Sequence, residues 1–381
     1  MIKLGDVATY INGYAFKPED RGEVGLPIIR IQDLTGNAYD LGFYNGDYPK
    51  RIEINDGDVL ISWSASLGVY VWNRGRALLN QHIFKVEFDK VNIDKSYFVY
   101  AVRQKLAEMA MKTHGATMKH IVKKDFEETL IPYPSQKKQI EIGTNLDKIA
   151  NIIAARKQQL ELLDELVKAR FVELFGDAIY NDKGWENDTV EKLCKEIYGG
   201  GTPSKSHPEY YEDGDIPWVS SKDMKTDVLT DSQIKINQLG VDNSTARMVP
   251  INSVIMVIRS GILKYTLPVA INAVPITVNQ DLKVFIPNKR VLTRFLAIQF
   301  KMHEKDILSG VRAVTADNIE FNSLKQRELI VPPIELQQEY VTFLEQIDKS
   351  KVSIYYKNRK DGFPPLLFIY SVTTITNLPG C

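Results

Sequence analysis

The sequence predicts an α+β fold made of two similar units, each a mixed α/β domain followed by a long helix. Two observations predict this fold. Four pairs of segments recur in the same order in the two halves of the chain, and such a repeat indicates a duplicated structural unit. Each half also ends in an apolar segment that runs into proline and then into a pattern with helical periodicity.

The repeated segments keep a nearly constant offset along the chain. The pairs are Lys3-Leu4 with Lys192-Leu193, LPIIRIQDL (26–34) with IPWVSSKDM (216–224), LNQHIFKVEF (79–88) with VNQDLKVFIP (278–287), and PSQKKQIEIGTNLDKI (134–149) with PPIELQQEYVTFLEQI (332–347). The last pair aligns without a gap. Chance explains any single match, but four matches in one order indicate a duplication.

The first domain is expected over residues 1–135. Residues 56–63 form an apolar run bounded by turn residues, and residues 82–88 alternate between apolar and polar side chains, which are both strand patterns. A helical stretch is expected at 97–112. The apolar segment 130–134 ends in proline, which stops a strand and also begins a helix well, because the first turn does not need the missing N–H.

The central helix, expected over residues 136–178, is the clearest single element. Between Gln136 and about Phe175 there is one glycine and no proline, and apolar residues recur mostly at steps of three, four or seven. About 40 residues correspond to roughly 60 Å of rod. A stripe of this length requires a partner, which the second helix supplies. The contact residues expected on the two helices are Leu146, Ile149, Ile153, Leu160, Leu163, Leu344 and Ile347.

The second domain is expected over residues 187–331, with a strand in 252–261, a helix over 292–308 and a final strand at 329–333. The second helix, expected over 332–360, is shorter than the first. Its apolar stripe ends near Lys351, and the segment DGFPP (361–365) breaks it. The tail 361–381 is uncharged after Asp361 and rich in β-branched residues, which resembles out-of-frame or recombined sequence and is an aggregation hazard if exposed.

Composition and motifs give no sign of a catalytic or metal site. The two cysteines cannot form a disulfide framework or a four-ligand zinc site, and the five histidines have no paired ligand spacing. Phosphate-binding, serine-hydrolase and amino-methyltransferase motifs are missing. The start MIKLGDVATY is not a signal peptide and no apolar stretch is long enough to span a bilayer, so a cytoplasmic protein without a membrane role is expected.

The formal net charge is zero, which counts mildly against nucleic-acid binding because such proteins usually carry a basic excess. It does not exclude that function. A basic groove can be balanced by acidic residues on other faces, and binding then depends on where Lys and Arg lie locally.

The chain resembles the specificity subunit of type I restriction–modification systems. The resembling residues are Gly200-Gly201-Thr202-Pro203-Ser204, Asp215-Ile216-Pro217-Trp218 with Lys222-Asp223, Gly57-Asp58-Val59-Leu60-Ile61-Ser62, residues 115–121, and Pro332-Pro333 with Glu335 and Gln337. The likeness covers about residues 1–350, and its specificity comes from the order and duplication of loose motifs. It implies two target-recognition domains, each reading one half of a split DNA site, and helices that pair as an antiparallel coiled coil.

The resemblance also implies partners and cofactors. Double-stranded DNA is the ligand of the chain itself, while two methyltransferase subunits and the motor-nuclease restriction subunits dock through the helices. The specificity subunit has no active site of its own, so S-adenosylmethionine, ATP and Mg²⁺ belong to the partner subunits. The early end of the second helix departs from the family pattern and bears on the second methyltransferase dock.

Candidate DNA contacts are side chains able to reach base edges and groups able to fix phosphates. We expect Arg30–Gln32 and Ser220–Lys222 on strand faces, where Arg30 can bridge guanine and Gln32 can pair with adenine. Loops with small residues can bring backbone N–H groups to phosphate. The full set is Arg30, Gln32, Ser62, Ser64, Lys119, His120, Thr202, Ser204, Lys205, Ser220, Lys222, Arg259 and Ser260.

Each of these features also has a plainer interpretation. A solvated strand face explains 30–32, an ordinary turn explains the serine- and glycine-containing loops, and a solvated charge run explains Lys119 and His120. The residues 200–205 are expected to form a mobile loop that closes on DNA, or else an ordinary glycine turn. Trp63 and Trp218 are more typical of a core than of base stacking.

The rigid helix predicts half-sites separated by a fixed unread gap, on the order of one to two helical turns of about 34–36 Å between centres. Two alternatives stay open. The chain can belong to a methylation-only or silent recombining locus, which the tail favours, or it can be a two-domain scaffold without a DNA role, which the zero net charge favours. The target bases do not follow from the sequence.

Overall fold

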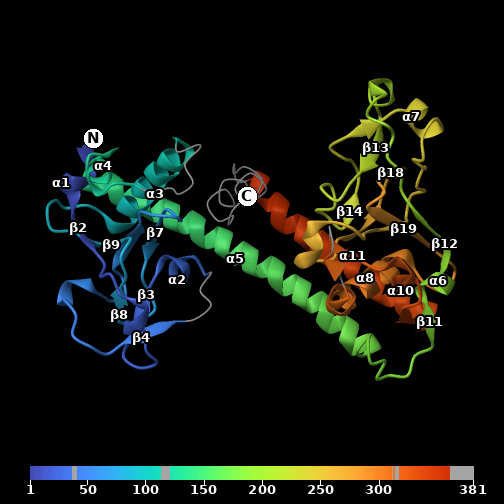
Figure 1. Ribbon diagram of the computed structural model, residues 1–381, viewed down its shortest axis with the longest axis horizontal. Helices are drawn as coiled ribbons and strands as arrows, with labels where there is room; N and C mark the ends of the chain where they lie inside the picture. The colour runs from blue at the N-terminus through green and yellow to red at the C-terminus, as the bar shows by residue number, and fades with distance from the viewer. Residues whose placement is uncertain (37–40, 113–120, 311, 314–316, 361–381) are drawn as a thin grey trace. The chain divides into compact units, whose positions relative to one another are not determined.

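The computed structural model describes residues 1–36, 41–112, 121–310, 312–313 and 317–360, with side chains through 109, over 121–310 and over 317–354. The chain divides into two compact units, one that includes residues 1–158 and one of residues 159–357. The helix α5 (Gln136–Phe175) has its first part in one unit and its last part in the other (Figure 1). Each unit is described by itself.

The first unit is built on two small sheets. One is antiparallel in the order β2 (Thr9–Asn12), β9 (Ile83–Glu87), β6 (Val59–Ser62) and β7 (Gly68–Val71). The other has the order β4 (Gly42–Tyr44), β3 (Leu26–Ile29), β8 (Ala77–Leu79) and β5 (Glu53–Ile54), and its β3 and β8 run parallel. The short pair β1 (Ile2–Lys3) and β10 (Leu130–Ile131) joins the beginning of the domain to its end.

Helices α1 (Leu4–Val7), α3 (Lys95–Lys112) and α4 (Lys123–Glu127) cover the first of these sheets. Helix α2 (Ile31–Thr35) packs with strands of the second sheet, and single turns lie at η1 (Pro18–Asp20) and η2 (Lys50–Ile52). Phe84, Phe98 and Phe126 are almost completely buried between sheet and helices. The core therefore lies where the antiparallel sheet meets α3 and α4.

The second unit contains the same arrangement. Its antiparallel strands follow the order β12 (Cys194–Gly199), β19 (Leu282–Pro287), β16 (Val254–Val257) and β17 (Val269–Asn272), with β14 (Val228–Leu229) added in parallel at the edge. A second sheet has the order β15 (Lys235–Ile236), β13 (Ile216–Val219) and β18 (Thr277–Val278), with β13 and β18 parallel. The pair β11 (Asn187–Thr189) and β22 (Glu328–Ile330) closes the domain.

The remaining elements of the second unit are mostly helical. They are α6 (Val190–Leu193), α7 (Gln238–Asp242), α8 (Thr293–Met302), α9 (Glu304–Ser309), α10 (Phe321–Lys325) and α11 (Ile334–Lys360), with η3 (Pro208–Tyr210), η4 (Gly261–Lys264) and the two-residue strands β20 (Arg312–Ala313) and β21 (Asp317–Asn318). The prediction of a single helix over 292–308 is wrong, because this segment forms two helices: α8 ends at Met302 and α9 begins at Glu304.

The duplication is confirmed by topology. The order β2-β9-β6-β7 in the first unit corresponds to β12-β19-β16-β17 in the second, the parallel pair β3·β8 corresponds to β13·β18, and β1·β10 corresponds to β11·β22. The strands predicted within 56–63, 82–88 and 252–261 are β6, β9 and β16, so these predictions are confirmed in shorter form.

The last part of α5 packs against α11 within the second unit. The Tyr340 hydroxyl donates to the carbonyl of Val167 (3.0 Å), Arg170 pairs with Glu339 (2.7 Å), and Lys351 pairs with Asp164. The α5 numbers fall as the α11 numbers rise, so the two helices are antiparallel there. Leu344 and Ile347, expected in the contact, are buried. The expected contact residues on α5 are only partly buried: Leu146, Ile149, Ile153, Leu160 and Leu163.

α5 begins at Gln136 as expected but ends at Phe175 rather than at 178, and α11 covers 334–360 against the expected 332–360. α5 has 40 residues and α11 has 27, so the second helix is the shorter one. An aromatic cluster of Phe171, Phe175, Phe295 and Tyr340 anchors both to the body of the second unit. The tail 361–381 lies outside the described residues.

Candidate nucleic-acid interface

In each unit the two sheets are joined by a turn that carries the repeated Asn-Gln pair. Asn80–His82 links β8 to β9, and Asn279–Asp281 links β18 to β19. The backbone N–H of Asn80 donates to the Ile29 carbonyl (3.0 Å), and that of Asn279 donates to the Val219 carbonyl (2.9 Å). We call these two segments the Asn-Gln turns.

The chain that leaves β2 or β12 crosses directly over the Asn-Gln turn. A Cβ on Gly13 would lie 2.0 Å from the Asn80 carbonyl oxygen, and a Cβ on Gly200 would lie 2.0 Å from the Val278 carbonyl oxygen. Only glycine permits such an approach. Beyond the crossing, Trp218 Nε1 donates to the Gly201 carbonyl (2.9 Å). In the segment 200–205, expected as a mobile loop or an ordinary glycine turn, the first half contacts the crossing point and the Trp218 indole.

Two of the predicted side chains of the second unit contact its Asn-Gln turn. The Thr202 hydroxyl bonds to Gln280 Oε1, and Arg259 Nε donates to Asp281 Oδ1 (2.7 Å). Ser220 follows Val219, whose carbonyl holds the Asn279 N–H, but its own hydroxyl donates to Asp223. Lys222 and Ser260 line a neighbouring pocket of about 740 Å³, together with Lys225 and Lys301. Ser204 and Lys205 lie exposed in the loop beyond Thr202.

The expected strand faces at 30–32 and 220–222 are wrong, because both strands end one residue earlier. A carboxylate closes a turn at each place. The Arg30 backbone N–H donates to Asp33 Oδ2 (2.8 Å), and the Ser220 N–H and hydroxyl donate to Asp223 Oδ2 (2.9 and 2.8 Å). Ile31–Thr35 is then helical, with Gln32 exposed on it. This capping explains why Asp33 and Asp223 are shared by the repeats.

The serine loop of the first unit also differs from expectation. Ser62 has no exposed surface and its hydroxyl donates to the Ser66 carbonyl, and Ser64 is buried as well. The structure assigns these two side chains to the packing of the loop rather than to its surface. Lys119 and His120 lie outside the described residues. Trp63 stacks on Phe84 with ring centroids 5.6 Å apart and Trp218 is buried, as expected for core residues.

The structure adds surface residues at the Asn-Gln turns that sequence reasoning did not select. Gln81 and Gln280 are exposed, His82 has a left-handed φ of +72° and contacts Trp63, and Tyr14 is 45% exposed where the chain crosses the turn. The signal was present, because Asn-Gln is one of the few dipeptides common to both repeats. It was interpreted only as evidence for duplication.

Within the described ranges, no group of three or more His, Cys, Asp or Glu side chains is placed to hold a metal ion. Burial raises the pKa of the Cys194 thiol to about 12, so that thiol is protonated at neutral pH. None of the described helices is both long and apolar enough to cross a membrane.

The chain is similar in sequence to known proteins. The family described as type I restriction modification DNA specificity domain matches residues 1–163 and 182–360. The EcoR124I/EcoR124II specificity subunit of Escherichia coli is 33% identical over 221 residues, which are 57% of this chain and 53% of that protein. The chain thus matches about half the length of that relative. The MjaIX specificity subunit of Methanocaldococcus jannaschii is 23% identical, with 92% of both chains covered.

Two solved structures have a similar fold. The type I restriction–modification S subunit from M. genitalium has a TM-score of 0.61 at 12% identity and covers 100% of this chain and 96% of its own. A chain from a study of the assembly of the type I R-M system has a TM-score of 0.50 at 13% identity, with 94% and 92% covered. Because the family matches both repeats and most of the sequence, the chain belongs to the family of type I restriction–modification DNA specificity domains.

Proposed function

We propose that this chain is the specificity subunit of a type I restriction–modification complex, and that its two domains select the two halves of a split DNA site. Residues 1–135 would read one half and residues 187–331 the other. The observation that carries the proposal is the repeated Asn-Gln turn, which presents an exposed glutamine in each domain and, in the second domain, also contacts Thr202 and Arg259.

The two domains keep the framework and change the side chains on it. Asn80 and Asn279, Gly13 and Gly200, and Asp33 and Asp223 are identical pairs that hold the backbone. The positions beside them differ, with Arg30 against Ser220, Gln32 against Lys222 and Tyr14 against Gly201. Base edges are read by side chains, whereas backbone geometry only positions the reader. Two domains built this way are suited to two different half-sites.

A zero net charge is compatible with this proposal because basic side chains are concentrated locally. Lys222 and Lys225 line one pocket of the second unit, which also holds Glu304 and the Lys301–Asp227 ion pair. Lys205 is exposed in the loop beyond Thr202. Arg259 is half-exposed and paired with Asp281. A phosphate or a base edge that approaches the second Asn-Gln turn would compete with the Asp281 carboxylate for the Arg259 guanidinium. Binding would then replace the Arg259–Asp281 ion pair with a contact between Arg259 and DNA.

The chain itself would catalyse no reaction. Methyltransferase subunits, two by analogy with the two domains, would bind S-adenosylmethionine and modify adenine, and restriction subunits would use ATP and Mg²⁺. The helices α5 and α11 are the elements best suited to dock them, because α5 carries the exposed apolar side chains Leu162, Leu166 and Val172 outside its contact with α11. Family membership supports these partners.

The test is the methylation pattern that the chain directs when it is produced together with its methyltransferase partner. The proposal predicts one split motif with a fixed gap. Binding of the purified complex to that motif should weaken steeply with salt, with a slope set by the number of phosphates contacted. Methylation without any motif, or retention on DNA that does not respond to salt, would refute it.

A further inference from the structure

We infer that Gln139 and Gln337 are positioning residues that fix each DNA-reading body on its helix and thereby set the length of the unread gap. The inference rests on the proposed function. It starts from two buried amides that occupy equivalent places in the two units, at the first turn of α5 and of α11.

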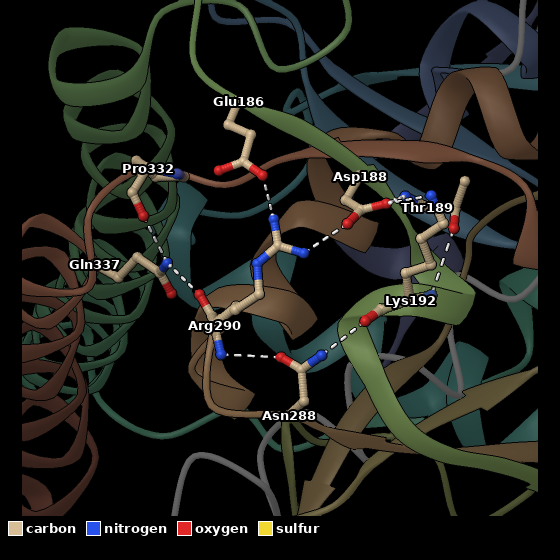
Figure 2. Close-up of polar contacts among 8 residues, drawn as sticks. All are labelled: Glu186, Asp188, Thr189, Lys192, Asn288, Arg290, Pro332 and Gln337. Carbon is tan, nitrogen blue, oxygen red and sulfur yellow. Dashed lines mark hydrogen bonds and ion pairs between the residues drawn. The ribbon is translucent and has the colours of Figure 1, made fainter.

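In the second unit every polar group of the Gln337 amide is used. Gln337 is 0% exposed, and its Oε1 accepts a hydrogen bond from the Leu292 backbone N–H (2.9 Å). Figure 2 shows the bonds that the same amide donates. Its Nε2 donates to the carbonyls of Arg290 (2.9 Å) and Pro332 (2.8 Å). One side chain therefore joins α11 to the loop that begins α8, which is the helix packed on the sheet that carries the Asn-Gln turn.

The first unit repeats this joint. Gln139 is 1% exposed, its Oε1 accepts from the Asp94 backbone N–H (2.9 Å), and its Nε2 donates to the Pro134 carbonyl (2.8 Å). The amide, its donor and its acceptor are each about 198 residues from their counterparts in the second unit. The same three-part contact is thus made twice, in both cases between a spacer helix and the start of the helix that covers the sheet.

An amide is the side chain that this position requires. It supplies an acceptor and two donors at once, and all are used in the second unit. A carboxylate would lose both donors and bring a charge into a dry site, while an aliphatic side chain of similar size would leave main-chain groups buried without partners. Packing alone would hold the helix near the body, but the amide fixes its rotation.

The joint of the second unit is reinforced by Arg290. Its guanidinium pairs with Glu186 and Asp188 at the beginning of the domain, while its carbonyl accepts from Gln337. Asn288 continues the connection by donating to the Lys192 carbonyl (2.7 Å) and accepting from the Arg290 backbone N–H (2.9 Å). Both ends of the domain are thereby tied to α11, as Figure 2 shows.

Such a joint matters because a DNA reader acts as a lever. A rotation of about 10° at one end of a body about 30 Å across moves the other end by roughly 5 Å, which exceeds the rise of about 3.4 Å per base pair. A loosened joint would therefore let one body reach neighbouring registers on DNA. The length of the helix sets the mean gap, and the two glutamines set how strictly that gap is kept.

The experiment compares Gln337→Leu with the control Gln338→Leu, an exposed neighbour on the same helix turn. The complex with its methyltransferase partner is titrated against DNAs in which the gap is lengthened or shortened by one and two base pairs. We expect Gln338→Leu to keep the sharp optimum of the natural chain. Gln337→Leu should lower the affinity about tenfold for DNA with the optimal gap, and much less for DNA with the neighbouring gap lengths. An optimum as sharp as in the natural chain would overturn the inference.

A second measurement does not depend on DNA. Spin labels are placed at Thr230→Cys in the body and Glu345→Cys on α11, in a chain with Cys194→Ala and Cys381→Ser, and their distance distribution is recorded by pulsed electron resonance. Gln337→Leu should broaden it and Gln338→Leu should not; an unchanged width overturns the inference. If the natural chain selects no motif while the distribution still broadens, the proposed function fails and the joint stands.

If Gln337→Leu does not fold, Gln337→Glu replaces it in both measurements. This variant keeps the acceptor for Leu292 and loses the donors to Arg290 and Pro332. It should broaden the distance distribution and reduce the gap selectivity relative to the natural chain. A Gln337→Glu chain that matches the natural chain in both would also overturn the inference.

Discussion

Asp33 and Asp223 illustrate how a single residue determines the surface presented to a ligand. Each carboxylate closes the turn after a parallel strand, and the side chains that follow then point out from a turn or short helix instead of alternating on a strand. A charged group at this position has a structural role first. Its effect on the candidate interface is indirect, because it sets the direction of Gln32 and Lys222.

Replacement of Asp223 by Ala should lower the free energy of unfolding by about 1–2 kcal/mol, since the Ser220 N–H and hydroxyl and the Gln233 N–H all donate to this carboxylate. Urea denaturation measures the change. Asp215→Ala, at an exposed position in the same domain, is the control and should change stability by less than about 0.5 kcal/mol. Equal effects of the two substitutions would contradict the capping role.

Asp281→Asn should strengthen DNA binding, because it releases Arg259 from its ion pair and removes a negative charge from the turn. Arg259→Ala should weaken binding by roughly tenfold, in line with the loss of one direct contact of about 1–3 kcal/mol. Fluorescence anisotropy with an unmethylated duplex that contains the target motif gives both affinities. If Asp281→Asn weakens binding as much as Arg259→Ala does, the ion pair itself is the structure that binds.

His303 should make stability depend on pH. It is buried between α8 and α9, and burial, followed by the nearby Arg327, lowers its pKa. Below the ordinary histidine pKa of about 6.5 the unfolded chain gains a proton before the folded chain does. Stability is therefore full above that pH and falls as the pH drops through it, by at most about 1.4 kcal/mol per pH unit.

Unfolding by urea at pH 7.5 and pH 5.5 tests this effect. His303→Gln should reduce the difference between the two pH values, while the exposed His207→Gln should leave it unchanged. Should His303→Gln keep the same pH dependence as the natural chain, other groups account for it.

At the scale of elements, the long helices were predictable and the short ones were not. Over α5 the apolar stripe continues for some 40 residues without proline, so local periodicity is sufficient. The helix α2 has five residues and forms because Asp33 caps it, and the break between α8 and α9 at His303 has no proline or glycine to announce it. Such boundaries depend on tertiary packing.

Only part of the candidate site was predictable, because it also depends on tertiary packing. Thr202 and Arg259 lie far apart in sequence, and their approach to one turn depends on the order of strands in two sheets. Ser62 was assigned to the surface because its loop contains several small polar residues, yet it closes a strand whose residues are all buried. Polarity alone does not reveal which side of a strand end faces solvent.

The contact between α5 and α11 should depend on a few deeply buried side chains. Leu344 is 2% exposed whereas Leu162, on α5, is 53% exposed. Leu344→Ala should lower the free energy of unfolding by about 2–4 kcal/mol through lost burial and a cavity, and Leu162→Ala should have little effect. Guanidinium denaturation of both variants measures this. Comparable losses would place the helix contact on the other face of α5.

For the whole molecule, the two bodies have separate cores. Under the proposed function, each half of the DNA site should therefore be chosen independently. Arg30→Ala should relax the base preference in one half of the methylated motif, and Arg259→Ala in the other. The double variant should show both changes with additive losses of affinity, because the residues belong to different units. Sequencing of methylated DNA from cells carrying each variant detects these changes. If Arg30→Ala lowers the affinity for all sequences equally, Arg30 contacts phosphate and not a base.

The pairing of each domain's first strand with its last bears on how the chain is made. β1 pairs with β10, so the strand pairings of the first body are complete once Ile131 has been made, while β11 must wait for β22 near residue 330. On the ribosome the first body can complete its long-range pairings while the second is still being synthesised. The α11 partner of the last part of α5 emerges later still. During that interval the side of α5 that α11 later covers has no helix on it. A chaperone or an early-binding partner subunit should therefore improve the yield of folded protein most at this stage.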